Sequence, residues 1–309
     1  MIKRTLHFGN PAYLNTKNDQ LVVNYPNDDQ LAKTVPIEDV GIIVLEHAQI
    51  TISNGLLDKL MGNNVAVITC NQQHLPISLM LPLSGHTEYN ERLRNQLNAS
   101  APLKKNLWQQ TVAQKIKNQA ELFRRQEHTP ITIYRKLRQL SESVQSGDPQ
   151  NNEGQAAAIY WGSLFELPYF SRGRKEEAPN NLLNYGYAIL RAVCARSLVG
   201  SGLLPASGIF HANKYNAYCL ADDIMEPYRP FVDDVVCEIV RTTSEYEKLT
   251  PQLKQQLLRI PALDVVIDGK KSPLMVAMSR TSSSLSDCFA GVSRKILYPD
   301  YGSGSIQST

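Results

Sequence analysis

The chain has 309 residues, enough to bury a sizeable core in one large domain or two ordinary ones. Although 42% of it is hydrophobic, no apolar run approaches the roughly 18 residues that span a bilayer, and the N-terminus lacks the apolar segment of a secretory signal. The five widely spaced cysteines form no CxxC pair, which argues against a disulfide framework and a zinc cluster. We therefore expect a globular cytoplasmic protein with reduced thiols and no membrane partner.

The net charge of +3 is small, but it is unevenly distributed along the chain. Residues 101–140 carry nine basic and two acidic residues, whereas the segments before and after them are slightly acidic. Such a stretch is typical of a solvated helix face and also of a surface that binds a polyanion. The second interpretation predicts that neutralising Lys115, Lys117, Arg124 and Arg125 weakens DNA binding.

The first part of the chain predicts a small β-rich domain over residues 1–85. Short apolar or alternating runs are separated by turn-rich pieces, and one helix is expected after Ser53 and Asn54, which offer capping oxygens. The runs expected to form strands are Ile2 to Phe8, Gln20 to Val23, Val40 to Leu45, Val65 to Thr69 and Leu75 to Leu81.

Residues 86–101 are expected to be a linker to a larger all-α catalytic domain over residues 102–297, and the polar tail 298–309 is expected to be disordered. The expected helices are Leu103 to Gln126, Ile133 to Val144, Glu153 to Glu166, Asn180 to Gly200, Asn213 to Glu226, Pro230 to Arg241 and one near Pro273 to Ile296. The sequence thus predicts an α+β protein with a β-rich N-terminal domain followed by an all-α domain.

The motifs of phosphate-binding loops, zinc proteases and serine hydrolases are absent, so isolated acidic and imidazole side chains are the candidates for chemistry. Glu153 lies in the first turn of an expected helix, where an acidic side chain interacts favourably with the helix dipole. The alanines at 156–158 allow another backbone to approach closely, so this helix is expected to be internal. A carboxylate on an internal helix needs a cation or hydrogen-bond donors.

His211 and a group of acids follow farther along the chain. His211 comes after an apolar pair, a position equally typical of a buried structural histidine. Asp223 and Glu226 share a helix face just before Pro227, at a helix end where the dipole disfavours acids. Two carboxylates and an imidazole are suitable ligands for Mg²⁺ or Mn²⁺. The spacing leaves open whether these side chains converge.

The run NNLLNYGYAILRAVCARSLVGSGLLPASGIFHANKYNAYCLADDIMEPYRPFVDDVV (Asn180 to Val236) resembles the core of the CRISPR-associated adaptation integrase, in its type II-like form. The resemblance extends upstream through EGQAAAIYW and the β region. It implies that Glu153, His211 and Glu226 bind Mg²⁺ or Mn²⁺ and that Asp223 assists. Many relatives have aspartate where this chain has Glu226, which leaves open whether Glu226 or Asp223 contacts the ion.

The resemblance also implies an activity and partners. The family joins the 3′-hydroxyl ends of short DNA fragments to the CRISPR repeat by transesterification, and water in the same role gives endonuclease activity. It implies a homodimer joined through the β domains, with two dimers flanking a small companion adaptation protein. Arg172, Arg174, Lys175 and Lys214 are expected to contact DNA phosphates or to be solvated loop charges. The alternatives are a metal-dependent nuclease of another DNA-processing pathway and a non-catalytic DNA-binding dimer.

Overall fold

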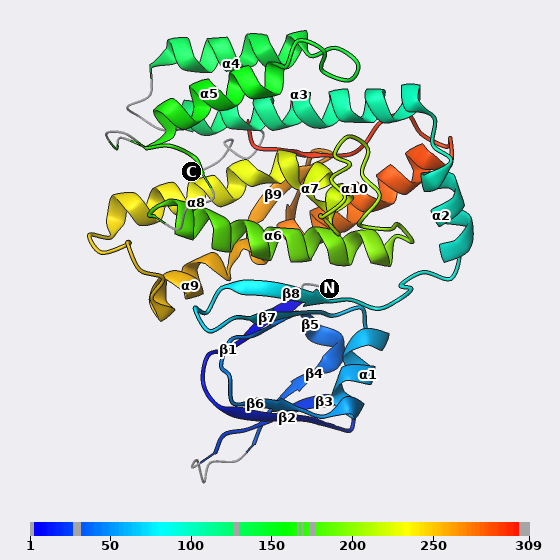
Figure 1. Cartoon of the computed structure of the whole chain (residues 1–309), viewed down its shortest axis with the longest axis vertical. Coiled ribbons are helices and arrows are strands. Elements are labelled where there is room, and N and C mark those ends of the chain that lie inside the picture. The colour runs from blue at the N-terminus through cyan, green and yellow to red at the C-terminus, as the bar shows by residue number, and fades with distance from the viewer. Residues whose placement is uncertain are drawn as a thin grey trace.

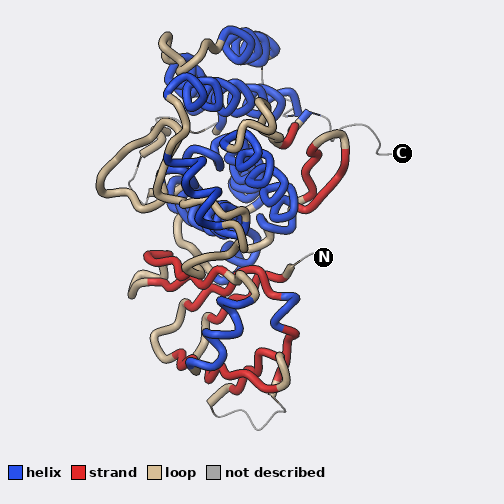
Figure 2. Tube along the Cα trace, turned by 90° about the vertical axis from the view of Figure 1, so that its right-hand side faces the viewer, coloured by secondary structure: helices blue, strands red, loops and turns tan. Residues whose placement is uncertain are grey.

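The molecule consists of a β-rich part below a larger helical part, as Figure 1 and the perpendicular view in Figure 2 show. The computed structural model describes residues 3–26, 32–125, 130–165, 167, 170–173 and 177–302. The predicted α+β class, a β-rich N-terminal region followed by a helical domain, is confirmed. The helical part also contains a three-stranded sheet, so the prediction that it is all-α is wrong in this respect.

The N-terminal part contains two four-stranded sheets and one helix. The first sheet has the order β1-β5-β7-β8, formed by Arg4–Phe8, Val40–Leu45, Ala66–Cys70 and Pro76–Met80. The second sheet has the order β4-β3-β2-β6, formed by Lys33–Pro36, Gln20–Asn24, Ala12–Lys17 and Ile50–Ile52. Helix α1 (Asn54–Gly62) begins after Ser53, whose side chain accepts a hydrogen bond from the Leu56 N–H. The short 3-10 helix η1 (Ile37–Asp39) precedes β5.

Strands β2, β4 and β6 of the second sheet were not predicted. β2 and β3 form a hairpin whose two central residues, Asn18 and Asp19, have φ of 51° and 57°. Asparagine and aspartate tolerate this left-handed conformation, which matches the twist of a two-residue hairpin loop. β2 carries polar side chains on its outer face, so it lacks the long apolar run that marked the other strands.

The two central strands of the first sheet, β5 and β7, are buried on both faces. Ile43 and Val67 face the core of the N-terminal part, whereas Ile42 and Ile68 belong to the core of the helical part. A sheet covered on both sides needs near-continuous apolar strands, which explains the run VGIIVL in β5. Helix α6 (Asn180–Gly200) lies against β7 and β8 on the second face.

The helical part is arranged around α6, which is buried along nearly its whole length. Helices α3, α4 and α5 lie above it and α7 and α8 beside it (Figure 1). The remaining helices are α2 (Tyr89–Leu97), α3 (Ala101–Arg125), α4 (Ile131–Ser143), α5 (Asn152–Leu164), α7 (Cys219–Met225), η2 (Glu226–Tyr228), α8 (Arg229–Thr242), α9 (Pro251–Leu257), η3 (Ile260–Ala262) and α10 (Leu274–Phe289). Within the described ranges, no helix has the length and apolar character to span a membrane.

Several predicted boundaries are wrong. The expected linker 86–101 contains α2, whose buried Gln96 donates two hydrogen bonds to backbone carbonyls, at Leu204 and Ser207. The helix expected from Asn213 begins only at Cys219, because the preceding residues form a loop held by side-chain hydrogen bonds.

The C-terminal segment also differs from the prediction. The last helix ends at Phe289, and the small sheet pairs β9 (Asp264–Ile267) with β10 (Lys270–Pro273) and with β11 (Pro299–Asp300). Tyr301 is buried against Phe231, so residues 298–302 of the expected disordered tail are packed into the fold. Residues 303–309 lie outside the described part of the chain.

Candidate active site

Glu153 lies in the first turn of α5, and other side chains cap this end of the helix. Asp148 accepts hydrogen bonds from the N–H groups of Asn152 and Glu153, at 2.9 and 3.0 Å, and the Asn151 side chain accepts one from Gly154. The Glu153 carboxylate is therefore not needed as a cap. Its Oε1 instead accepts a hydrogen bond from Lys115 Nζ on α3, at 2.6 Å.

Glu226 occupies the junction of α7 and α8 and is almost completely buried. Its Oε2 lies 2.7 Å from Lys115 Nζ, and its Oε1 lies 3.0 Å from Arg229 Nε. Burial by itself raises the pKa of Glu226, but the charges of Arg229 and Lys115 more than offset this and hold it below its ordinary value. Glu226 is therefore an ionised carboxylate, and Lys115 and Arg229 supply positive charge at this helix end, where the dipole alone disfavours an acid.

His211 is held in place by Asp223, which is wholly buried in α7. The Asp223 carboxylate accepts a hydrogen bond from His211 Nδ1 and others from the N–H groups of Ile209 and Phe210, at 2.8 and 3.0 Å. The hydrogen bond with Asp223 raises the pKa of His211 above its ordinary value, and burial opposes the rise. Because Nδ1 is engaged, Nε2 is the nitrogen available to a ligand, the usual arrangement for a metal-binding histidine.

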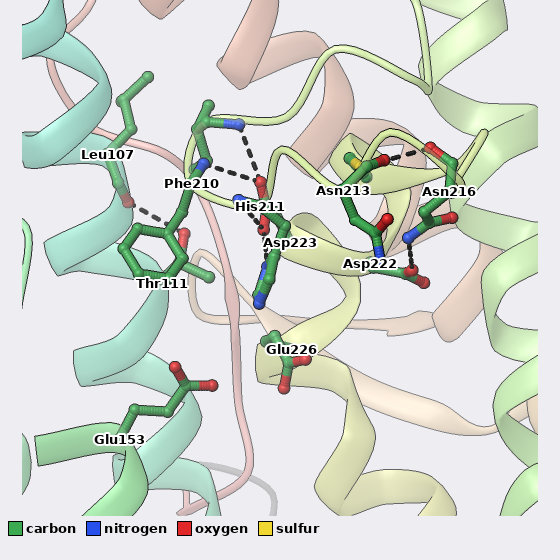
Figure 3. A network of polar contacts seen from close by, with 12 residues as sticks. Leu107, Thr111, Glu153, Phe210, His211, Asn213, Asn216, Asp222, Asp223 and Glu226 are labelled. Carbon is green, nitrogen blue, oxygen red and sulfur yellow. Dashed lines mark hydrogen bonds and ion pairs between the residues drawn. The ribbon is translucent and has the colours of Figure 1, made fainter. Parts of the chain in front are cut away.

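Glu153 and Glu226 converge on Lys115, and His211 is directed toward the same region (Figure 3), although the three residues come from α5, η2 and the loop before α7. Figure 3 shows the two carboxyl groups and the imidazole ring directed toward the same region. Lys115 Nζ contacts both glutamates, so their nearest oxygens are no farther apart than the sum of those two contacts. The negative charges of Glu226 and Glu153 also act on the pKa of His211.

The donor set suits a hard divalent cation, because it offers two carboxylates and an imidazole whose other nitrogen is fixed. Glu226 Oε2 is buried, and its partner in this structure is a cation, the Lys115 ammonium at 2.7 Å. In the described part of the chain, however, no three His, Cys, Asp or Glu side chains are close enough together to hold a metal ion. The ammonium group of Lys115 lies between the two glutamates, where it provides the positive charge.

Lys115 is the site residue that the sequence did not indicate. Its side chain is only 12% exposed. Burial by itself lowers the pKa of Lys115, but Glu226 and Glu153 raise it above the ordinary value. Its neighbours Val112, Ile116 and Gln119 are buried, so the residue lies on the inner face of α3. That position within a basic helix was the available signal.

Three other basic residues of α3 also have partners inside the protein. Lys117 forms an ion pair with Asp300, Arg124 pairs with Glu121 in its own helix, and Arg125 donates to the carbonyl of Tyr301. Part of the positive charge of residues 101–140 is therefore paired with groups inside the protein. Each of the four residues expected to form a DNA-binding face, Lys115, Lys117, Arg124 and Arg125, has such a partner in this structure.

Arg172 lies near Glu226, whereas Lys214 lies in the loop after His211. Arg172 donates to the side chains of Asn180 and Asn184, each at 2.9 Å, and lines a cavity of about 160 Å³ together with Lys115 and Glu226. Lys214 is exposed in the loop after His211, with its ammonium 4.8 Å from the centre of the Tyr215 ring. The other two residues expected to bind phosphate, Arg174 and Lys175, lie outside the described residues.

This chain is similar to a family of known proteins. A family model described as "CRISPR associated protein Cas1" matches residues 7–260. The chain belongs to the Cas1 family. It is 37% identical over 295 residues to the "CRISPR-associated endonuclease Cas1" of Neisseria meningitidis serogroup C, and the match covers 96% of this chain and 94% of that protein. The resemblance noted in the sequence is thereby confirmed.

Solved structures share the Cas1 fold. A casposase bound to an integration product superposes with a TM-score of 0.72 at 18% identity, covering 98% of this chain and 93% of that one. A chain of a Cas6-RT-Cas1–Cas2 complex gives a TM-score of 0.74 at 18% identity, covering 96% of this chain and 36% of that one. At these identities the likeness concerns the fold alone.

Proposed function

We propose that this Cas1 family member is a metal-dependent DNA endonuclease and integrase of CRISPR adaptation, which joins the 3′-hydroxyl ends of short DNA fragments to the CRISPR repeat. The observation that carries the proposal is that Glu153 and Glu226 both contact the Lys115 ammonium group, beside an imidazole that Asp223 holds in place. The Neisseria relative, named as an endonuclease, supports the same activity.

In this proposal Glu153, Glu226 and Nε2 of His211 hold Mg²⁺ or Mn²⁺. When bound, the ion neutralises charge on the phosphodiester and orients the attacking hydroxyl. Asp223 keeps the imidazole in the orientation that leaves Nε2 free. Arg172 and Arg229, which line the adjoining cavity, supply further positive charge for a phosphate group.

The reaction is an exchange of phosphodiester bonds. The 3′-oxygen of the fragment forms a bond to phosphorus and loses its proton, while the bond from phosphorus to the 3′-oxygen of the repeat strand breaks and that oxygen gains a proton. Attack by water on the same phosphorus gives strand cleavage. No covalent bond to the protein is needed, consistent with a site built from carboxylates and an imidazole.

The proposal includes a homodimer, two copies of which flank a small companion adaptation protein, and a cytoplasmic location. Strand β8 supports an interface on the β-rich part, because it is the edge of its sheet and exposes Ile77 and Met80, at 65% and 44%. The solved Cas6-RT-Cas1–Cas2 complex, which has a similar fold, supports a companion protein.

An integration assay tests the activity. A labelled fragment and a repeat-containing plasmid are incubated with Mg²⁺ or Mn²⁺, and we expect joined product with wild type but none with Glu153→Ala or in chelator. Glu142→Gln is the matched control, because this glutamate lies on the surface of α4 with a side chain 68% exposed. Joining in chelator would refute the metal dependence, cleavage without joining would indicate a nuclease of another pathway, and DNA binding without either would indicate a binding module.

A further inference from the structure

One buried ammonium group is shared by the two candidate ligand carboxylates. Lys115 Nζ lies 2.6 Å from Glu153 Oε1 and 2.7 Å from Glu226 Oε2, and the two glutamates come from different elements, α5 and η2. Two carboxylates brought together in a poorly hydrated site repel each other unless a cation lies between them. Lys115 therefore does in this structure what a divalent cation would do.

The second cation beside Glu226 is attached differently. Arg229 forms an ion pair with Glu226, and its guanidinium also lies over the Tyr187 ring, 4.5 Å from the ring centre. Among the described residues, the ion pair of Arg229 is with Glu226 and not with Glu153, so Arg229 does not link the two carboxylates. A lysine carries a compact charge on a flexible four-carbon stem, so its ammonium can leave without movement of α3.

We propose that Lys115 is a resident counter-ion, which keeps Glu153 and Glu226 together in the metal-free enzyme and which an incoming divalent cation must displace. The inference rests on the proposed function, because it concerns the same carboxylates. Lys115 is then a positioning residue: it preserves the geometry of the site before metal and DNA arrive, and it lowers the affinity for metal by competing for the same oxygens.

The structure offers the displaced side chain a second position. The cavity of about 160 Å³ beside Glu226 is lined by both Lys115 and Gln119. Gln119 lies one helical turn after Lys115, on the same side of α3, and its buried Oε1 has no hydrogen-bond partner. An ammonium that leaves the carboxylates therefore finds an unused acceptor and stays within the site.

The first experiment measures stability without metal. In EDTA, the urea midpoint of Lys115→Met should fall well below that of wild type, and adding Glu226→Gln should restore much of the loss because the repulsion is removed. Lys117→Met is the matched control on the same helix, since Lys117 pairs with Asp300 and is more exposed. A midpoint for Lys115→Met no lower than that of Lys117→Met would overturn the inference. If Lys115→Met does not fold, the double variant Lys115→Met with Glu226→Gln decides the question. Failure of the double variant to fold would also overturn the inference.

The second experiment measures metal affinity in the absence of DNA. Titration of Mn²⁺ followed by electron paramagnetic resonance should give about tenfold tighter binding for Lys115→Met than for wild type, whereas Lys117→Met should match wild type. Equal or weaker binding by Lys115→Met would overturn the inference. If Glu226→Gln leaves Mn²⁺ binding unchanged, the metal site of the proposed function is wrong, and the experiment in EDTA still decides the role of Lys115.

Discussion

Asp223 holds His211 at two points, because its buried carboxylate accepts from both the ring Nδ1 and the backbone N–H of that residue. The same carboxylate accepts from the two preceding N–H groups, so it fixes the loop as well as the ring. In the proposed function Asp223 therefore orients the metal ligand His211 and does not itself bind the ion. The sequence alone had left these two roles open.

Asp223→Asn should lower metal affinity and strand transfer by about 10- to 100-fold, the usual effect of losing the partner that orients a metal-binding histidine. It should also destabilise the protein, since several donors lose a charged acceptor. Asp222→Asn is the control, because Asp222 is the adjacent acid but pairs with Arg191 and Asn216. Comparable losses in both variants, measured by Mn²⁺ titration and the integration assay, would contradict this role.

His211→Ala should lose far more integration activity than DNA affinity. In the proposed function the imidazole contributes to metal binding and transition-state stabilisation, whereas phosphate contacts depend on lysine and arginine side chains elsewhere. Fluorescence anisotropy with labelled DNA gives the affinity, and the plasmid assay gives the activity. A parallel fall of both quantities would show that His211 is structural.

The pH dependence of stability should reveal Asp233. Burial raises the pKa of Asp233 from 3.8 to about 6, although hydrogen bonds from Tyr187 and Tyr160 oppose the rise. The folded protein then binds more protons than the unfolded chain between these values, so this contribution to stability is present below pH 4 and is lost as pH rises through 6.

The comparison with Asp233→Asn isolates this contribution. From pH 4 to pH 7 wild type should lose on the order of 3 kcal/mol relative to the variant, as followed by urea unfolding at several pH values. Asp264→Asn, at an exposed position of β9, should show no such divergence. Parallel pH profiles for wild type and Asp233→Asn would refute the prediction.

A dimer that uses the edge of β8 should weaken when charge is placed there. Ile77→Lys with Met80→Lys should shift the full-length protein toward monomer in analytical ultracentrifugation, because two charged edges repel. Val292→Lys is the control, since this valine is 78% exposed but lies in the helical part. An unchanged dimer fraction in the β8 variant would place the interface elsewhere.

The sequence predicted those elements whose local pattern agrees with their burial. The apolar run of β5 and the long buried helix α6 were located at their observed bounds. Helix α2 was missed because it is mostly polar and is anchored by buried Gln96, whose partners lie more than 100 residues away. Tyr301 was missed because its packing against Phe231 depends on tertiary structure alone.

The sequence predicted the residues of the candidate site but not how they are arranged. The resemblance supplied Glu153, His211 and Glu226, whereas their convergence and the contribution of Lys115 depend on how α3 packs against α5 and η2. A lysine in a basic helix gives no local sign of the partner that it will find. The sequence therefore indicated which residues carry charge but not which charges cancel.

The central strands of the first sheet couple the stability of the β-rich part to that of the helical part, because they contribute side chains to both cores. Ile42 and Ile43, adjacent in β5, serve different cores, and Glu46 just after that strand accepts from Lys254 of α9 at 2.7 Å. A chain divided after residue 85 would leave one apolar face of this sheet in water and remove the lower wall of the helical core. We therefore expect one cooperative melting transition for the intact chain. A substitution that disrupts the packing of β5 should destabilise the helical part as severely as the β-rich part.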